Sequence, residues 1–169
     1  MGKAILYLAD GTEECEALLC ADLPRRAGAE VILAAVGGRR EIVSSHGVAI
    51  RADALAEEAD VARADLLILP GGWPGTKHLE DCPAVREAVL AFAAAGKPIA
   101  AICAAPSILG HLGLLKGRRA TAFPSFRKEL AGAILTEGDV VRDGPFLTAP
   151  GLGAAIPFAL ALTETLEGP

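Results

Sequence analysis

The sequence lacks an excess of positive charge. Its 169 residues include 16 Lys and Arg against 21 Asp and Glu, which gives a formal net charge of -5, and the two signs are interspersed. No basic stripe is present that would neutralise a phosphate backbone or bind anionic lipid. We therefore expect neither nucleic acid nor a membrane surface as a partner.

Long apolar segments are also missing. Gly, Pro or charged residues interrupt every apolar run well before the length of about 18 residues that a membrane helix needs. The first apolar stretch, residues 4–9, is too short for the hydrophobic part of a secretory signal, and no cleavage-site pattern precedes Asp10. This pattern predicts a cytoplasmic protein without a transmembrane helix.

Metal-binding patterns are absent from the four cysteines, Cys15, Cys20, Cys82 and Cys103. They form no C-x-x-C pair, and no histidine stands at ligand spacing from any of them. We therefore expect no structural zinc, and we predict no other metal and no cofactor. In a reducing compartment each cysteine is a free thiol, and a free cysteine is most often a small buried apolar side chain. Only local context can single one out.

About half of the residues (52%) are apolar, which is enough for one substantial core, and we expect a single domain over residues 1–169. Apolar strands are predicted at residues 3–9, 30–36, 65–69 and 98–102, and helices at 13–27, 84–95 and 154–166. Short later strands are predicted at 119–122, 134–135, 140–142 and 145–148, and a hairpin arm at 41–43 and 48–51. Alternation of buried strands with helices predicts an α/β fold with a mostly parallel sheet covered on both faces.

The segment from Pro98 to Pro106 is a buried apolar strand followed by small residues and a new helix, with almost no connecting loop. This is the pattern of a nucleophile elbow, in which Cys103 projects above the carboxyl edge of the sheet. Because a helix N-terminus favours negative charge, we expect the pKa of Cys103 to be lowered. A packed junction with an unreactive cysteine is the alternative interpretation of the same residues.

Two glycines end the strand predicted next to Cys103, in the segment Pro70–Gly72. Glycine permits a backbone N–H group to face the space above the thiol, so Gly72 is a candidate oxyanion donor. The N–H group of Ala104 is the second candidate. A plain strand-ending turn explains the two glycines equally well when they are taken alone.

Three glutamates, Glu13, Glu14 and Glu16, open the first predicted helix. Carboxylates interact favourably with the helix dipole there, and that is a sufficient explanation for any one of them. Glu16 differs because it lies on the face of Glu13 and is followed by an apolar run. We expect Glu16 to point inward with a raised pKa, where it can donate a hydrogen bond to a thiolate or exchange a proton with a substrate.

In order and spacing, four motifs together resemble the ThiJ/PfpI superfamily, which is class I glutamine-amidotransferase-like. They are Gly11–Glu16, Leu69–Gly72, Ala100–Pro106 and Thr148–Gly153. Within it the chain is similar to the Parkinson-disease-associated deglycase and chaperone branch and its bacterial members. The resemblance covers nearly the whole chain and implies a flavodoxin-like three-layer sandwich and a homodimer.

The resemblance also implies roles for individual residues. Cys103 would be the nucleophile, Glu16 its protonated partner, and Gly72 with Ala104 the oxyanion donors. His46 lies on the hairpin arm, where the resembling proteins place a basic residue that reaches the partner's site near positions matching Glu13 and Arg26. We therefore consider His46, Glu13 and Arg26 as cross-subunit residues; an exposed loop histidine is the alternative for His46.

Two departures from the family pattern bear on the reaction. Ala104 stands where hydrolytic members of the superfamily have a histidine after the nucleophile, and Phe123 replaces the histidine of a Thr-x-His-Pro segment. A Cys-His hydrolase is therefore disfavoured. The resemblance implies a glyoxalase or deglycase acting on small reactive aldehydes or glycated substrates. The alternative is a redox-responsive chaperone or oxidative-stress sensor that works through oxidation of Cys103 without turnover.

Overall fold

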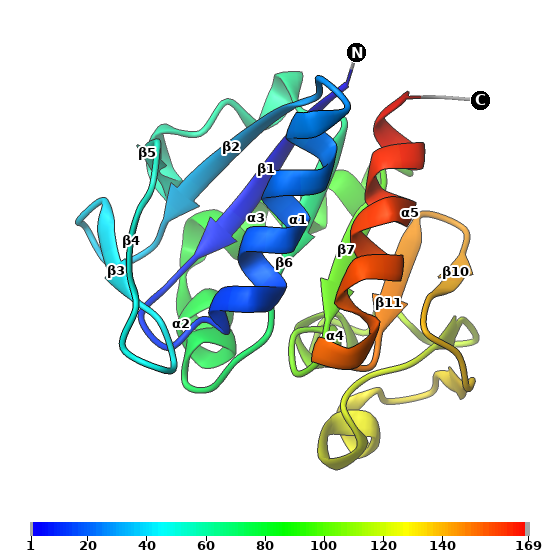
Figure 1. The fold of residues 1–169 in the computed structure, drawn as a ribbon. Coiled ribbons are helices and arrows are strands. Elements are labelled where there is room, and N and C mark those ends of the chain that lie inside the picture. The colour runs from blue at the N-terminus through cyan, green and yellow to red at the C-terminus, as the bar shows by residue number, and fades with distance from the viewer. Residues whose placement is uncertain (1, 168–169) are drawn as a thin grey trace.

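The computed structural model describes residues 2–167 and contains a seven-stranded main sheet in the order β10-β11-β7-β6-β1-β2-β5 (Figure 1). Every neighbouring pair in it is parallel except β10 with β11, which is antiparallel. The strands are β1 (Lys3–Leu8), β2 (Glu30–Ala35), β5 (Ala54–Leu55), β6 (Leu66–Leu69), β7 (Ile99–Ile102), β10 (Val141–Asp143) and β11 (Phe146–Ala149).

Helices cover both faces of this sheet. α1 (Glu14–Arg26) and α5 (Ala155–Glu167) pack side by side on one face, and α2 (Gly75–Asp81), α3 (Pro83–Ala94) and α4 (Pro106–His111) lie on the other (Figure 1). Alternate residues of each central strand enter the two cores: Leu6 faces α1 and α5, whereas Ile5 faces the opposite layer. The predicted flavodoxin-like three-layer α/β sandwich is confirmed.

Two small sheets lie apart from the main one. β3 (Glu41–Val43) and β4 (Ala49–Arg51) form the predicted antiparallel arm. β8 (Arg119–Ala120) and β9 (Ile134–Leu135) form a short parallel pair. α2 was not predicted, because its seven residues contain a single large buried apolar side chain, Leu79, and therefore show no apolar period.

The arrangement of the central strands decides where a site can form. β11, β7, β6 and β1 are neighbours and run parallel, so the segments that follow them meet at the carboxyl edge of the sheet. Ligands of open α/β sheets bind at such an edge. Within residues 2–167, no helix combines the length and the apolar character that crossing a membrane requires.

Candidate active site

Cys103 occupies the turn between β7 and α4 in a left-handed backbone conformation, with φ of 64°. Its N–H donates to the carbonyl of Ala149 (2.9 Å), and its carbonyl accepts from the N–H of Phe123 (2.8 Å). Non-glycine residues with positive φ are uncommon and cost free energy, so they persist where the surrounding structure holds them, often at functional sites. The segments that contain Ala149 and Phe123 hold the turn at Cys103 through these two hydrogen bonds. Cys103 itself remains partly exposed.

Glu16 lies in the first turn of α1 and is completely buried. The carboxylate of Glu13 accepts a hydrogen bond from the Glu16 N–H (2.6 Å) and thereby caps the helix. Among the residues that the structure describes, neither side-chain oxygen of Glu16 has a hydrogen-bond partner of ordinary geometry, and Glu16 interacts instead with the Cys103 thiol. The expected inward orientation of Glu16 is what the structure shows.

Gly71 separates the acid from the thiol. A Cβ atom at this position would lie 2.5 Å from the Cys103 Cβ and 2.7 Å from the Glu16 Oε1. Real Cβ atoms do not approach other atoms so closely, because packed interiors leave no such space. The absence of a side chain at Gly71 therefore allows Glu16 and Cys103 to face each other.

Burial, together with the charge of Glu13, raises the pKa of Glu16 to about 7, while the contact with Cys103 acts in the opposite direction. A carboxyl group without water or cations nearby favours its neutral form. Near neutral pH this acid is therefore divided between its protonated and ionised states. This pKa suits a group that has to accept and return a proton.

The pKa of Cys103 was expected to be lowered, and this expectation is wrong for the resting site. Burial, followed by the charge of Glu16 and its contact with the thiol, raises this pKa to about 12, against the lowering effect of the N–H groups of Ala104 and Gly72. α4 has only six residues and begins at Pro106, three residues after the thiol, so its dipole is too weak to outweigh burial beside a carboxylate. The resting thiol is neutral.

The N–H groups of Gly72 and Ala104 both act on the Cys103 sulfur, as an oxyanion hole beside the thiol requires. Gly72 has φ of 94°, and a Cβ on it would lie 2.3 Å from the backbone nitrogen of Glu13. Only glycine therefore fits at this turn. The predicted donors are brought together at the thiol, and their role in catalysis remains a prediction.

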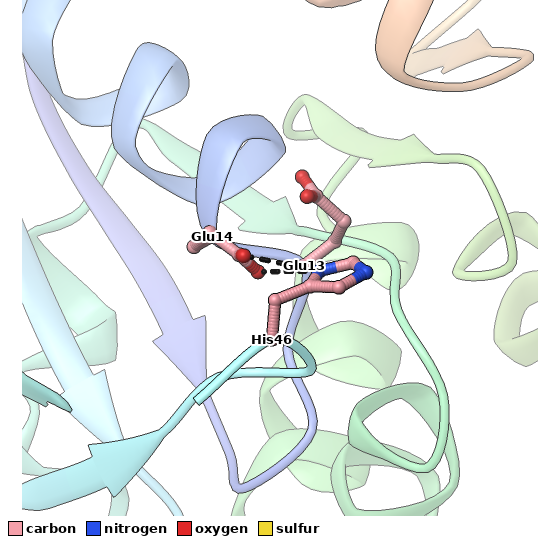
Figure 2. Close-up of side chains that lie close together, drawn as sticks. All are labelled: Glu13, Glu14 and His46. Carbon is pink, nitrogen blue, oxygen red and sulfur yellow. Dashed lines mark hydrogen bonds and ion pairs between the residues drawn. The ribbon is translucent and has the colours of Figure 1, made fainter. Parts of the chain in front are cut away.

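His46 lies in the loop between β3 and β4, where it contacts a residue of its own chain (Figure 2). Its Nδ1 is 3.0 Å from the Glu14 carboxylate. That carboxylate also interacts with its own backbone N–H and with Ser45, and these contacts hold the pKa of Glu14 below its ordinary value. The structure thus pairs His46 with Glu14, a partner that the sequence did not single out.

Arg26 is not brought near His46 or Glu13 within one chain. It forms an ion pair with Asp22 (2.7 Å) at the far end of α1, about 20 Å along the helix from Glu13. Only a second copy of the chain would place Arg26 beside the other two. The cross-subunit role of these three residues therefore remains a prediction.

Within residues 2–167, Glu13, Glu14 and His46 form a cluster that could hold a metal ion, since each offers one ligand atom and these atoms lie within 4.8 Å of one another. Their ligand atoms already make contacts within the protein, because the Glu13 carboxylate caps α1 and the Glu14 carboxylate contacts His46. The N-terminus of α1 favours anions over cations. A metal-free and cofactor-free site remains our prediction.

Comparison with known proteins identifies the family. The model described as the DJ-1/PfpI family matches residues 2–165. Protein DJ-1 homolog B of Arabidopsis thaliana is 39% identical over 167 residues, 98% of this chain; the chain spans only 38% of that protein and 43% of homolog A. The glutathione-independent glyoxalase DJR-1.2 of Caenorhabditis elegans is 32% identical over 168 residues, which are 98% of this chain and 88% of that protein.

A solved structure shows the same architecture. Toxoplasma gondii DJ-1, in an oxidised form, superposes with a TM-score of 0.92 at 35% identity and covers 99% of this chain and 95% of its own. The family model, the relatives and the solved structure thus agree over nearly the whole chain. The chain therefore belongs to the DJ-1/PfpI family, as its four motifs predicted.

Proposed function

We propose that the protein is a cysteine-dependent glyoxalase or deglycase that acts on reactive dicarbonyls or early glycation adducts. One observation carries the proposal: an isolated buried acid, Glu16, faces the Cys103 thiol across Gly71, with two backbone N–H groups directed at the sulfur. The relative named as a glutathione-independent glyoxalase adds support, since its name describes this chemistry without a thiol cofactor.

The first step would be addition of the thiol to the aldehyde. The Cys103 sulfur forms a bond to the aldehyde carbon, the carbonyl electron pair moves to oxygen, and the thiol proton passes to the Glu16 carboxylate. The N–H groups of Gly72 and Ala104 stabilise the alkoxide, which then takes the proton back from Glu16. The product is a neutral hemithioacetal with Glu16 ionised again.

The second stage converts this adduct into a hydroxy acid. For methylglyoxal, Glu16 removes the proton from the hemithioacetal carbon to give an enediolate. The hydroxyl proton then moves to the neighbouring oxygen and Glu16 returns its proton to the adjacent carbon, which leaves a thioester of lactate on Cys103. Water then attacks the thioester carbonyl, the carbon–sulfur bond breaks, and the thiol is regenerated. Overall, methylglyoxal and water give lactate, and no electron acceptor is consumed.

The direct test is to incubate the purified protein with methylglyoxal and to measure lactate. We expect lactate to accumulate well beyond the amount of enzyme, without added glutathione or metal. Formation of no more than one equivalent per chain, or none, would rule out turnover. The same preparation treated with a chelator should keep its activity.

Gly71→Ala is expected to lower kcat for lactate formation at least about tenfold, because its Cβ would push the thiol and Glu16 apart. Overpacking should also cost roughly 1–3 kcal/mol of unfolding free energy. The matched control is Gly153→Ala, whose Cβ meets nothing within 4 Å. Kinetics and urea unfolding of both variants check this; full activity of Gly71→Ala would show that the contact between acid and thiol is not needed.

The redox-responsive sensor or chaperone remains the alternative, and one observation favours it: the Toxoplasma relative has been described in an oxidised form. The four cysteines of this chain are free thiols, and Cys103 is partly exposed, so oxidation to sulfenic or sulfinic acid is open to it. Protein that responds to peroxide at Cys103 but forms no lactate would favour this role. Free thiols also support the cytoplasm as our proposed location.

We further propose that two copies associate through α1. A groove of about 650 Å³ runs along this helix, and its apolar lining includes Leu18, Leu19 and Leu33. In a symmetric dimer the same patch meets itself, so one substitution acts twice. Such a contact would also bring Arg26 of one copy toward the first helix of the other, which is the cross-subunit arrangement that the family resemblance implies.

Leu19→Arg is expected to shift the molar mass of the protein from two chains to one at micromolar concentration, because the dimer would bury two charges without partners. Leu18→Arg, at a more exposed position, provides a second variant in case Leu19→Arg does not fold. Leu90→Arg, on α3, is the matched control. Light scattering across a dilution series is the measurement; a wild-type mass of one chain would contradict the dimer.

A further inference from the structure

Aromatic side chains are scarce in this chain and unevenly distributed. The set comprises one Trp, one Tyr and five Phe. Four members are buried in the core: Tyr7, Phe92, Phe146 and Phe158. The three that are not buried lie on the segments that flank Cys103: Trp73, Phe123 and Phe126.

Backbone contacts place two of these residues, Trp73 and Phe123, beside the thiol. Trp73 directly follows Gly72, whose N–H acts on the Cys103 sulfur. Phe123 donates its N–H to the Cys103 carbonyl at 2.8 Å. A Cβ on Gly151 would lie 3.5 Å from the Phe123 ring and 3.9 Å from the Cys103 sulfur, so the ring and the sulfur face the same glycine.

The indole of Trp73 is held by a second ring. Its centroid lies 5.7 Å from that of Phe126, at an interplanar angle of 43°. This contact joins the loop after β6 to the segment Pro124–Glu129 and restricts the indole, yet Trp73 remains 55% exposed and Phe123 46% exposed. Large aromatic faces held in place beside a reactive group are typical of a binding surface for an apolar ligand.

The charges around the thiol limit which ligands fit. Its acidic neighbours are Glu16 and, next to Gly72, Glu13. Arg127, on the segment that carries Phe126, has its guanidinium bound to Glu137 (2.6 Å) and to the carbonyl of Ala122. A substrate that carries its own carboxylate would bring a further negative charge beside these two acids, whereas a neutral substrate would not.

We propose that Trp73, Phe123 and Phe126 form a subsite for the apolar, planar group of a neutral aldehyde, so that the protein prefers aryl 2-oxoaldehydes to methylglyoxal. This inference rests on the proposed function and specifies its substrate class. Trp73 binds the aryl group, and Phe126 is a positioning residue that holds the indole. The aldehyde carbon of such a substrate then lies at the Cys103 sulfur.

Kinetics test the preference directly. An aromatic contact corresponds to roughly a threefold to tenfold change in relative specificity. Trp73→Ala should lower the ratio of kcat/KM for phenylglyoxal to that for methylglyoxal by this factor, and Trp73→Phe should retain most of the ratio. Leu90→Ala, an exposed apolar residue on α3, is the control. An unchanged ratio in Trp73→Ala would overturn the subsite.

Binding can be measured without turnover. Because the chain has one tryptophan, the nitrogen-15-labelled Cys103→Ala protein should show a single indole N–H resonance. We expect this resonance to shift saturably on titration with acetophenone and not with acetone, and we expect the shift to be lost in Cys103→Ala/Phe126→Ala. A resonance that responds equally to both ketones, or to neither, would contradict the subsite.

The two experiments separate this inference from the proposed function. One outcome is that the wild type forms lactate while Trp73→Ala leaves the ratio of the two kcat/KM values unchanged and acetophenone does not shift the indole resonance. That outcome would contradict the subsite and support the glyoxalase proposal. If acetophenone shifts the indole resonance but neither aldehyde is turned over, the subsite stands and the glyoxalase proposal is wrong.

Discussion

Cys103→Ser is expected to lower kcat/KM for methylglyoxal by roughly a thousandfold or more. A serine hydroxyl is a much weaker nucleophile than a thiol, and its higher pKa disfavours loss of its proton to Glu16, whose pKa is about 7. The substitution keeps the size of the side chain and its β-carbon. The φ of 64° and the two backbone N–H groups should therefore be unaffected.

The control for this result is Cys82→Ser. Cys82 is the N-cap residue of α3 and makes no capping hydrogen bond there. Serine is a preferred N-cap residue, so this variant should keep full activity and gain up to about 1 kcal/mol of unfolding free energy. Equal losses of activity in both variants would indicate a general effect of cysteine replacement and would remove the evidence for Cys103 as nucleophile.

Glu16→Gln is expected to lower kcat by roughly 10²- to 10⁴-fold, because glutamine can neither accept the thiol proton nor move the proton of the hemithioacetal. The pH profile provides a more specific readout. In the wild type, kcat/KM should rise as pH increases through about 7, where Glu16 ionises. The variant should show no rise with this midpoint. A retained rise would assign the titration to another group.

Although Glu16→Gln lowers activity, it should increase the stability of the folded protein relative to the wild type at neutral and higher pH. The pKa of Glu16 is raised from 4.5 to about 7 in the folded protein, so between these values the folded state binds more protons than the unfolded state. Stability therefore falls as pH rises from about 4.5 to 7, and the loss is complete above pH 7. It amounts to roughly 3 kcal/mol. The glutamine of Glu16→Gln does not ionise, so the unfolding free energy of the variant does not fall in this way.

Urea unfolding of the wild type and Glu16→Gln at pH 5 and pH 8 measures this effect. The free energy difference between the two proteins should shift in favour of the variant by roughly 2.5 kcal/mol between the two pH values, because part of the loss has already occurred at pH 5. Other groups with shifted pKa values, such as His111 and Glu129, are common to both proteins and cancel. A difference that is independent of pH would show that Glu16 does not ionise while buried.

Most of the main sheet was predictable because its strands are continuous apolar runs between turn residues, as in β1 and β7. Buried parallel strands require this composition on both faces. β5 and α2 were not predicted because neither contains such an apolar run. β5 has two residues, and α2 buries one large apolar side chain, so neither shows a period that would mark it.

The sequence by itself predicted the fold class from its alternating apolar strands and helices, the family from its resemblance in four motifs, and Cys103 and Glu16 as candidate site residues. Only the tertiary structure decided how the two groups behave. Burial beside a carboxylate raises the pKa of Cys103 to about 12, against the direction expected from a helix N-terminus. Gly71 as the spacer, the His46–Glu14 pair and the aromatic residues around the thiol all depend on distances between segments remote in sequence. Dielectric environment and through-space contact are properties of the packed molecule, and no local pattern encodes them.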